Sequence, residues 1–395
     1  MSKILSIFQN PCNGYTLLWC LYYLQGILYT SGGMVSKLVL AAVLFISIIH
    51  MVKCLQQFKL PVYFKGLTLL LAAFVIYGLI RTFLDTRVSG VASFTFLKNV
   101  SMSLLPIYSY FYYTKKGYLT ELNLKLYVFA FLGVSIAEFF YEQQMRMLEA
   151  LDGRTDFTNN SSYLIIGLLP LTVFLNKRLI VQYGVIAVIL VFAVMGFKRG
   201  AMLVALASVL LMVWESVKKM KGGRKMLVMV FAAVVMAYVF QYAEQYVGSS
   251  DYFTYRYEKT LAGDASGRED MYPMYFNYFI NQNTFSGFLF GNGLDATVFI
   301  FGNGAHNDWL EIAIDMGLLG IILYLIYWYY FTKTLRSSRK LNPVHLVLLL
   351  VFISDLLKTF FSFSIYNRPI ASTCALGYCL AIIAMSQEKK ILLQR

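Results

Sequence analysis

The sequence predicts an all-α polytopic membrane protein, and three observations lead to that prediction. Of the 395 residues, 59% are hydrophobic and only 14% are charged, whereas soluble domains carry about 25% charged residues. The apolar residues form runs long enough to cross a bilayer, which takes roughly 20 residues. Basic residues gather in alternate connections between these runs. We expect one transmembrane domain over residues 1–395.

Twelve apolar runs predict about twelve transmembrane helices. The sixth run is the weakest, because it is short and contains Pro170. The runs lie near residues 15–31, 36–52, 63–83, 94–113, 124–141, 160–175, 179–195, 200–217, 226–245, 306–331, 344–363 and 369–386.

The formal charge of +14 follows the expected topology. With the N-terminus inside, both tails and every second connection hold 21 basic residues and three acidic ones. Short loops with such an excess of Lys and Arg are cytoplasmic. Both termini are therefore expected inside, and the basic charge does not indicate a nucleic-acid partner.

Several classes of site are disfavoured by missing motifs. None of the five cysteines lies in an outward connection, so the sequence indicates no disulfide framework. It contains no CxxC or HExxH metal pattern and no P-loop. We expect no cofactor and no direct nucleotide hydrolysis.

The outward connection at residues 246–305 is the longest in the chain, and 142–159 is the next. A connection of this length in a compact membrane protein is usually functional. Residues 268–281 predict a short helix dominated by tyrosine and phenylalanine, a composition that suits the membrane interface. Glycines after it permit tight turns. We expect this large extracytoplasmic loop to act on an externally presented substrate.

Lys198 and Arg199 are two adjacent cations in a tight outward turn, where positive charge is otherwise scarce. An anionic ligand would explain them, because the planar fork of an arginine suits phosphate oxygens. The alternative is that both side chains reach lipid head groups of the outer leaflet.

Arg268, in "ASGRED", is a second candidate cation on the outer side. An arginine in a polar loop is most often solvated or paired with a neighbour, here Glu269 or Asp270. A functional role is the alternative to such pairing.

His306 is the only histidine expected on the outer face. An imidazole with a pKa of about 6.5 accepts a proton from a hydroxyl at neutral pH. Asn307 or Asp308 can cap the helix that follows. Asp308, Glu311 and Asp315 share one helix face, so one of them could orient the histidine. The alternative is a capped helix start with an incidental histidine.

Further cations stand near the outer ends of spans, and ionisable groups there are functional suspects by default. Lys358 follows Asp355 by three residues, so an intrahelical ion pair is its alternative explanation. The set comprises Arg81, Arg87, Lys98, Lys358 and Arg368.

Three stretches together resemble the O-antigen polymerase and O-antigen ligase superfamily of bacterial envelope glycosyltransferases. "FKRGAMLVAL" is similar to the family's Ser-Arg-Gly start of a span, with Phe197-Lys198 at the serine-containing approach. "SGREDMYPMYFNYFINQNTFSGFLFGNGLD" resembles its Gly-Arg, aromatic helix and Gly-x-Gly progression. "AHNDWLEIAIDMGLLGIILYL" resembles its His-Asn, acidic, Gly-Leu-Leu-Gly helix entry.

The resemblance implies a metal-independent, integral-membrane transferase of the GT-C type, with an undecaprenyl-diphosphate-linked oligosaccharide as donor. Arg199 and Arg268 would hold the diphosphate, and His306 would activate the acceptor hydroxyl. With one base and no evident nucleophilic carboxylate, direct displacement with inversion is the simpler hypothesis. Supporting substrate contacts are expected from Lys198, Arg81, Lys358, Arg368, Glu311 and Asn307.

The leading interpretation is a polymerase that joins lipid-linked repeat units of an O-antigen, capsule or exopolysaccharide. It would act at the outer face of the bacterial cytoplasmic membrane, with membrane lipids and a chain-length regulator protein as partners. An O-antigen ligase, which moves the glycan to lipid A core or another acceptor, would use the same chemistry. A flippase of lipid-linked sugar is the alternative of another class, although transporters tend to show internal pseudo-repeats.

Overall fold

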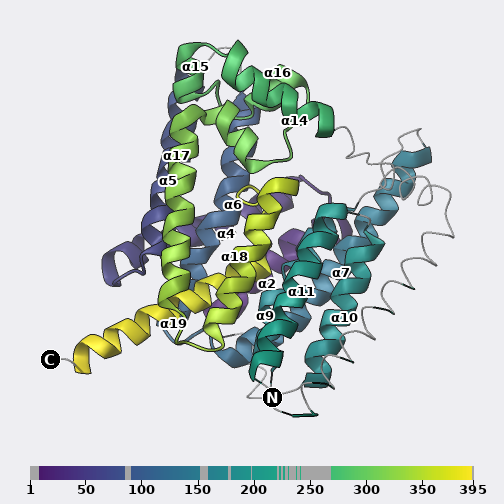
Figure 1. The fold of residues 1–395 in the computed structure, drawn as a ribbon, viewed down its shortest axis with the longest axis vertical. Coiled ribbons are helices and arrows are strands. Elements are labelled where there is room, and N and C mark those ends of the chain that lie inside the picture. Colours follow the sequence, from purple (N-terminus) through teal and green to yellow (C-terminus); the bar gives the residue numbers. More distant parts are fainter. Residues whose placement is uncertain are drawn as a thin grey trace.

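The computed structural model describes residues 9–84, 90–151, 159–176, 179–196, 198–219 and 268–393, with isolated positions between 222 and 241. Side chains are described in these ranges except at 81–94, 149–151, 219, 391 and 393. Every regular element in the described part is helical (Figure 1). The all-α prediction is therefore confirmed for those residues.

The N-terminal third forms long helices at nearly the expected positions. The expected first span, 15–31, is instead two helices, because the chain leaves helical geometry at Leu24. The helices are α2 (Pro11–Tyr23), α3 (Gln25–Leu28), α4 (Met34–Gln57), α5 (Tyr63–Leu84), α6 (Gly90–Lys115) and α7 (Glu121–Leu151).

The middle of the chain is more broken. The weak sixth run forms α8 (Ser161–Ile166), α9 (Leu169–Thr172) and a 3-10 turn (Val173–Leu175), with Pro170 in the first turn of α9. Proline fits there because it lacks the N–H that a helix start leaves unpaired. Two longer helices follow, α10 (Leu179–Met195) and α11 (Arg199–Lys219). Most of the expected span 226–245 lies outside the described residues.

The described part of the large loop folds into a small helical unit, which we call the cap (residues 268–301). The predicted helix at 268–281 is confirmed as α14 (Arg268–Asn277), which continues into a π-helical turn, Tyr278–Gln282. The short helices α15 (Phe285–Phe290) and α16 (Ala296–Phe301) complete the cap. Three long helices end the chain: α17 (Asp308–Ser337), α18 (Val344–Phe361) and α19 (Ile370–Leu393).

Seven described helices are long and apolar enough to cross a membrane, and two shorter apolar stretches, Ser161–Leu175 and Leu179–Met195, accompany them. The chain is thus a polytopic helical membrane protein. The expected count of about twelve stays a prediction.

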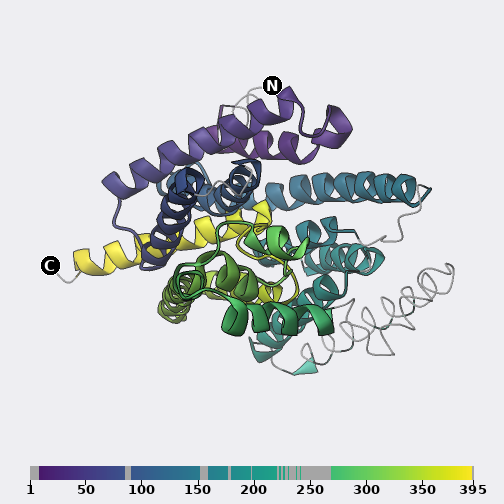
Figure 2. The ribbon, with the colours of Figure 1, turned by 90° about the horizontal axis from the view of Figure 1, so that it is seen from above.

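The helices pack as a bundle with the cap at one end. Helix α6 lies against α4 and α19, α17 lies against α5, and α11 lies against α18. Helices α15 and α16 sit on α17. Seen from above, the cap covers the region of α17 and α18, and α2 and α4 lie at the opposite edge of the bundle (Figure 2).

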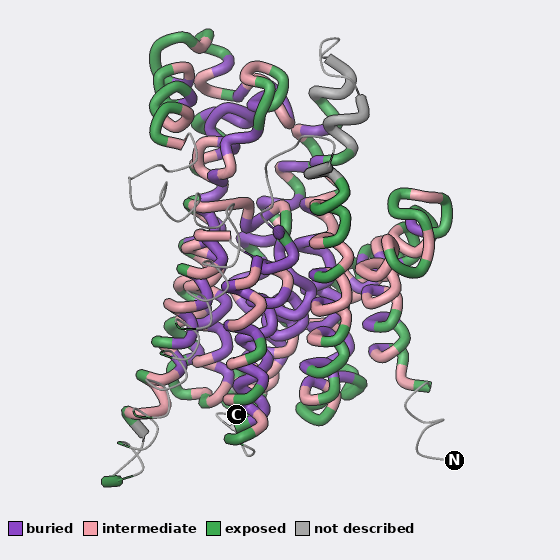
Figure 3. The backbone as a smooth tube through the Cα atoms, turned by 90° about the vertical axis from the view of Figure 1, so that its right-hand side faces the viewer, coloured by how far each residue is buried: buried purple, intermediate pink, exposed green. Residues whose placement is uncertain are grey.

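Burial separates an aromatic interior from an apolar exterior. Buried positions concentrate along the middle of the bundle (Figure 3), and the largest fully buried side chains there include Trp19, Tyr108 and Tyr324. Large apolar side chains on the outer surface, such as Phe45 and Leu210, are more than half exposed. An apolar surface of this kind suits contact with lipid chains, which are as apolar as leucine.

Helix α17 is broken near its start, which the sequence did not predict. Gly317 has φ 66° and ψ −159° inside the helix. The break frees the carbonyl groups of Ile314 and Asp315, and these accept hydrogen bonds from the N–H groups of Asn292 (2.9 Å) and Gly293 (3.1 Å). The backbone groups lost to the helix are therefore satisfied by the cap.

Two glycines make this contact possible. A Cβ atom on Gly291, whose φ is 78°, would lie 2.1 Å from the Asp315 carbonyl oxygen. A Cβ atom on Gly317 would lie 2.6 Å from the backbone nitrogen of Gly291. Both backbones approach too closely for any side chain, so the turn 291–293 seats directly on the break in α17.

The cap lies at one end of the bundle, so its contacts show which helix ends are beside it and which are at the other end. The Tyr77 hydroxyl, near the end of α5, lies 2.6 Å from the Phe290 carbonyl oxygen and 2.7 Å from that of Asp315. The end of α5 and the start of α6 therefore lie beside the cap. The end of α4, the start of α5 and the end of α6 lie at the other end of the bundle, which we call the far end.

Candidate active site

The turn before α11 positions Lys198 and Arg199 by close glycine contacts. A Cβ atom on Gly196 would lie 1.7 Å from the Ser162 hydroxyl oxygen, and one on Gly200 would lie 2.4 Å from the Tyr163 hydroxyl oxygen. Only glycine lets the turn approach α8 so closely. Both cations are half-buried at the start of α11.

Arg268, the first residue of α14, reaches the end of α18. Its guanidinium donates a hydrogen bond to the Phe361 carbonyl oxygen at 3.2 Å. One turn later, the Tyr272 hydroxyl donates to the Phe360 carbonyl oxygen at 3.1 Å. Both bonds satisfy carbonyl groups that a helix end leaves without partners. The Arg268 bond therefore goes to α18, whereas pairing with Glu269 or Asp270 was the alternative.

Burial raises the pKa of Tyr272, and the positive charge of Arg268 opposes that rise. The hydroxyl therefore remains a hydrogen-bond donor at neutral pH.

His306 lies directly before α17 in a left-handed backbone conformation with φ 49°. Its ring is half-buried, and the ring centroid lies 5.4 Å from that of Phe363. Asn307 is the N-cap, as expected, because its side-chain oxygen accepts from the N–H groups of Trp309 (3.0 Å) and Leu310 (3.3 Å). The N-cap hydrogen bonds of Asn307 thus fix the chain at the residue after the histidine.

Glu311 holds the loop that carries His306. It is buried, and one carboxylate oxygen accepts from the Ala305 N–H at 2.8 Å. The other accepts from the Thr297 hydroxyl at 2.5 Å. Glu311 therefore joins α16, α17 and the residue before His306, so it is a positioning residue for this loop.

Asp308 and Asp315, the other two acids of the expected face, bind other backbone segments. The buried Asp308 carboxylate accepts from the N–H groups of Ser364 (3.1 Å) and Ile365 (3.3 Å). Asp315 accepts from the Asp295 N–H at 3.0 Å. These bonds tie α17 to the segment after α18 and to the cap.

The segments that carry the three predicted site residues approach the end of α18 and the residues after it, 360–363. Gly200, next to Arg199, packs on Phe361, because a Cβ atom there would lie 2.6 Å from the Phe361 Cβ. Arg268 donates to the carbonyl oxygen of the same residue. His306 lies against Phe363. Segments far apart in the sequence are thus brought together at the cap end of the bundle (Figure 1).

Lys358 and Tyr163 lie one turn deeper. Lys358 is 4% exposed, and its ammonium lies 4.9 Å from the centroid of the Tyr163 ring. The ammonium donates to the Asn367 carbonyl oxygen and is close enough to Lys198 to feel its charge. Tyr163 is buried and close to Arg268, and Ser362 lies beside its hydroxyl without a well-formed hydrogen bond. A buried hydroxyl among cations is suited to donate to an anionic ligand.

Residues 183–325 match the family model described as O-antigen ligase. This match supports the resemblance of the chain to the O-antigen ligase and polymerase superfamily. The matched stretch begins in α10 and ends in α17, so it contains Lys198, Arg199, Arg268 and His306. No curated protein matches the chain.

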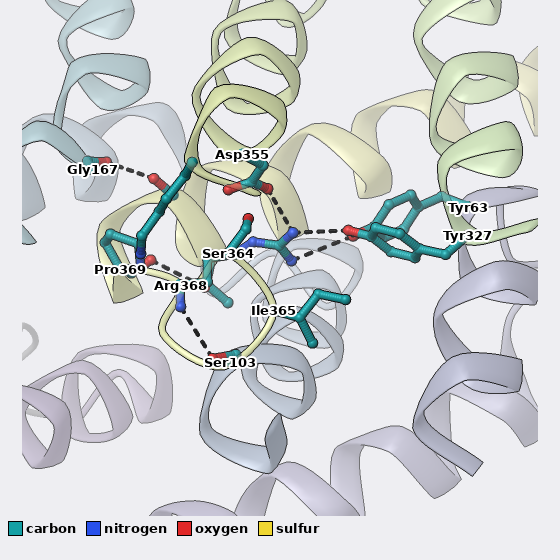
Figure 4. A network of polar contacts seen from close by, with 12 residues as sticks. Tyr63, Ser103, Gly167, Tyr327, Asp355, Ser364, Ile365, Arg368 and Pro369 are labelled. Atoms are coloured by element: carbon teal, nitrogen blue, oxygen red, sulfur yellow. Dashed lines mark hydrogen bonds and ion pairs between the residues drawn. The ribbon is translucent and has the colours of Figure 1, made fainter. Parts of the chain in front are cut away.

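Arg368 is buried in the bundle, where protein side chains bind its guanidinium (Figure 4). It is 3% exposed, and its guanidinium lies 2.6 Å from the Asp355 carboxylate and 2.8 Å from the Tyr327 hydroxyl. The Arg368 N–H donates to the Ser103 hydroxyl at 3.1 Å. These contacts link α6, α17 and α18 and give Arg368 protein partners in place of a ligand.

The same network bears on whether Lys358 forms an intrahelical ion pair with Asp355, the alternative to a functional role. Asp355 was expected to pair with Lys358 along α18, but its ion pair is with Arg368 at 2.6 Å. The segment after α18 turns back into the bundle and brings the arginine to the carboxylate. No carboxylate lies within ion-pair distance of Lys358 among the described residues.

Three sequence candidates are left. The side chain of Arg81 and the whole of Arg87 lie outside the described residues. Lys98 is exposed on α6. No group of three His, Cys, Asp or Glu side chains that could hold a metal ion occurs in the described part of the chain, and metal independence stays a prediction.

Sequence reasoning missed two aromatic residues of the site, Tyr163 and Tyr272. A tyrosine in an apolar run is indistinguishable from core packing by composition alone. The one available signal for Tyr163 was indirect: two glycines, 196 and 200, flank the cationic turn and require a close neighbour.

Proposed function

We propose that the chain is a glycosyltransferase that polymerises lipid-linked repeat units of an envelope polysaccharide. The donor is an oligosaccharide on undecaprenyl diphosphate, and the acceptor is another lipid-linked unit. The site lies at the outer face of the cytoplasmic membrane, with both termini on the inner side. The match of residues 183–325 to the O-antigen ligase family model supports this class of reaction.

One observation carries the proposal. The start of α11, the start of α14 and the residue before α17 all contact residues 360–363. The backbone segments that carry Arg199, Arg268 and His306 therefore approach one short stretch of chain from separate elements. Ionisable groups gathered near a membrane-spanning region are functional suspects by default, and an anionic ligand suits the cations among them.

The chemistry needs these groups for different tasks. As the donor's anomeric C–O bond breaks, its electron pair moves to the diphosphate, and Arg199 and Arg268 stabilise the growing charge. Fixed charges of this kind are usually the largest catalytic contribution. The acceptor hydroxyl oxygen forms the new bond to the anomeric carbon, and its proton passes to His306. Direct displacement inverts the anomeric configuration.

Lys198, Lys358 and Tyr163 supply further positive charge and one hydroxyl donor near the diphosphate. Asn307 and Glu311 hold the backbone on both sides of His306, which keeps the imidazole in place. Because these residues perform every step, a chelator such as EDTA should leave the rate unchanged. Loss of activity on chelation, restored by added Mg²⁺, would contradict this assignment.

A ligase is the second candidate, and the description of the matching family favours it. It would transfer the finished glycan to lipid A core or another acceptor through the same three groups. The two activities differ in acceptor alone, and a chain-length regulator would be a partner of the polymerase.

Reconstitution of the purified full chain with lipid-linked repeat units and no other component tests the proposal. We expect long products with inverted linkages. Product that forms only after a second acceptor is added would support the ligase. Translocation without any new glycosidic bond would reject both transferase proposals.

A further inference from the structure

An open groove of about 440 Å³ lies at the far end of the bundle, away from the proposed active site. It runs between α2, α4 and α6 and is lined by apolar positions that include Gly14, Leu18 and Ile46. His50 and Tyr113 also line it. Its size and apolar walls suit a hydrocarbon chain of a lipid.

Two lysines converge beside the groove. The Tyr112 ring stacks on His50, with centroids 4.4 Å apart and the planes 15° from parallel. The Lys53 ammonium lies 5.6 Å from the centroid of the same ring, and that of Lys116 lies 5.8 Å from it. The Lys116 ammonium also lies 5.5 Å from the centroid of the Phe58 ring. Two cations around one aromatic ring would both attract an anion bound beside it.

Neither lysine has a carboxylate at ion-pair distance within the described ranges, whereas the neighbouring Lys115 pairs with Glu388 at 2.6 Å. Lys125 and Lys218 also pair with carboxylates. Two unneutralised positive charges therefore lie near the groove.

The start of α2 lies at the same place. Pro11, the first residue of this helix, lines the groove. The side-chain amide of Asn10 donates to the Tyr118 carbonyl oxygen at 2.7 Å, which holds the helix start beside the turn that follows Lys116. Its first N–H groups are already bound to Asn10, so the helix start contributes only the positive end of its dipole.

We propose that this groove binds an anionic phospholipid of the membrane leaflet at the far end. One acyl chain would lie in the groove, and the phosphate would sit between Lys53, Lys116 and the start of α2. Loop lysines near a membrane surface attract anionic lipids in general, and here the apolar groove adds a place for the chain.

Native mass spectrometry of the purified full chain, titrated with phosphatidylglycerol or phosphatidylcholine of identical acyl chains, tests this proposal. We expect wild type to bind one phosphatidylglycerol about 30-fold more tightly, from two lysines at a membrane surface. The double variant Lys53→Gln, Lys116→Gln should lose this preference. The charge-matched control Lys333→Gln, Lys340→Gln, also on the basic side, should retain it.

A second variant tests the groove without touching a charge. Gly14 lines it, and a Cβ atom there meets nothing within 4 Å, so Gly14→Leu should fold and fill the groove. It should weaken binding of both lipids. Equal affinity of wild type for the two lipids, or an unchanged preference in the double lysine variant, would overturn the proposal. Loss of the preference in 10 mM inorganic phosphate would indicate a free-anion site and would also overturn it.

Discussion

His306 combines an imidazole that can take a proton with a left-handed backbone, φ 49°. Outside glycine, such a conformation costs about 1–3 kcal/mol and persists only where the surroundings enforce it. Here the N-cap hydrogen bonds of Asn307 fix the residue after His306, and the Glu311 carboxylate binds the N–H of Ala305, the residue before it. These hydrogen bonds hold the left-handed backbone, and the imidazole ring lies against Phe363, just after α18.

Replacement of His306 by asparagine removes the proposed base without disturbing the left-handed backbone. Asparagine tolerates the left-handed region but cannot act as the base. We expect the turnover rate of His306→Asn to fall by about 10²–10⁴-fold, with donor binding unchanged. Rate and affinity in reconstituted vesicles give the result. His345→Asn, at the opposite end of the bundle, serves as control. Near-normal chain length in His306→Asn would show that another group is the base.

Tyr163→Phe removes one buried hydroxyl and keeps the ring beneath Lys358. If that hydroxyl donates to the diphosphate, the KM for the donor should rise about tenfold or more, since a hydrogen bond to a charged group contributes about 1.5–3 kcal/mol. The turnover rate should change less. An unaltered KM would mean that the hydroxyl has no contact with the donor, while the rest of the site could stand.

Variants of Arg368 test whether this buried cation stabilises the fold or binds substrate. Arg368→Met leaves Asp355 buried without its partner, which costs about 3–5 kcal/mol, so we expect poor folding by thermal-shift measurement. The double variant Arg368→Met, Asp355→Leu removes both charges and should recover stability and activity. A folded double variant that no longer binds donor would return Arg368 to the substrate site.

At this scale, sequence reasoning singled out residue types that are rare for their setting. Arg199, Arg268 and His306 stood out because charges and histidines are scarce on the outer side, and the resemblance suggested their roles, which stay predictions. It could not foresee that Arg368 points into the bundle, because position near a span end does not fix side-chain direction. Tyr163 gave no signal of its own among thirty tyrosines.

At the scale of elements, the cap and α17 depend on each other through two glycines. Gly291 and Gly317 meet backbone to backbone, and the broken helix gives its free carbonyl groups to the turn 291–293. His306 and Arg268 stand on the two sides of this junction, in the loop before α17 and in the cap. The junction therefore sets the distance between them.

Gly291→Ala and Gly317→Ala should each loosen the cap. The added methyl group would clash with backbone and also disfavour the positive φ. We expect faster hydrogen exchange in residues 285–301 and loss of activity. Gly302→Ala is the matched control, because its φ is 76° but a Cβ atom there meets open space. Equal exchange in all three variants would mean that the close approach does not hold the cap.

Hydropathy located most of the long helices, since apolar length is what it measures. It could not predict that the first span divides into two helices at Leu24, or that α17 is broken at Gly317. A break in a helix is stable only when other groups satisfy its freed carbonyls, and here those groups come from residues 292 and 293. That dependence is tertiary, so a local pattern does not reveal it.

On the scale of the whole molecule, the bundle separates two chemistries. The segments that carry the proposed catalytic cations and histidine approach one another beneath the cap, and two lysines lie near an apolar groove at the far end. The charge asymmetry of the sequence already indicated two different faces. Which residues on each face come together depended on the packing of α8, α11, α14 and α18, and this lay beyond composition.

A cryo-EM map of His306→Asn in a lipid bilayer with the undecaprenyl-diphosphate-linked repeat unit tests the central claim most directly. The account predicts density for both phosphates within contact of Arg199 and Arg268, with the anomeric carbon facing position 306. A donor whose diphosphate lies elsewhere, with the three residues apart from it, would contradict the account.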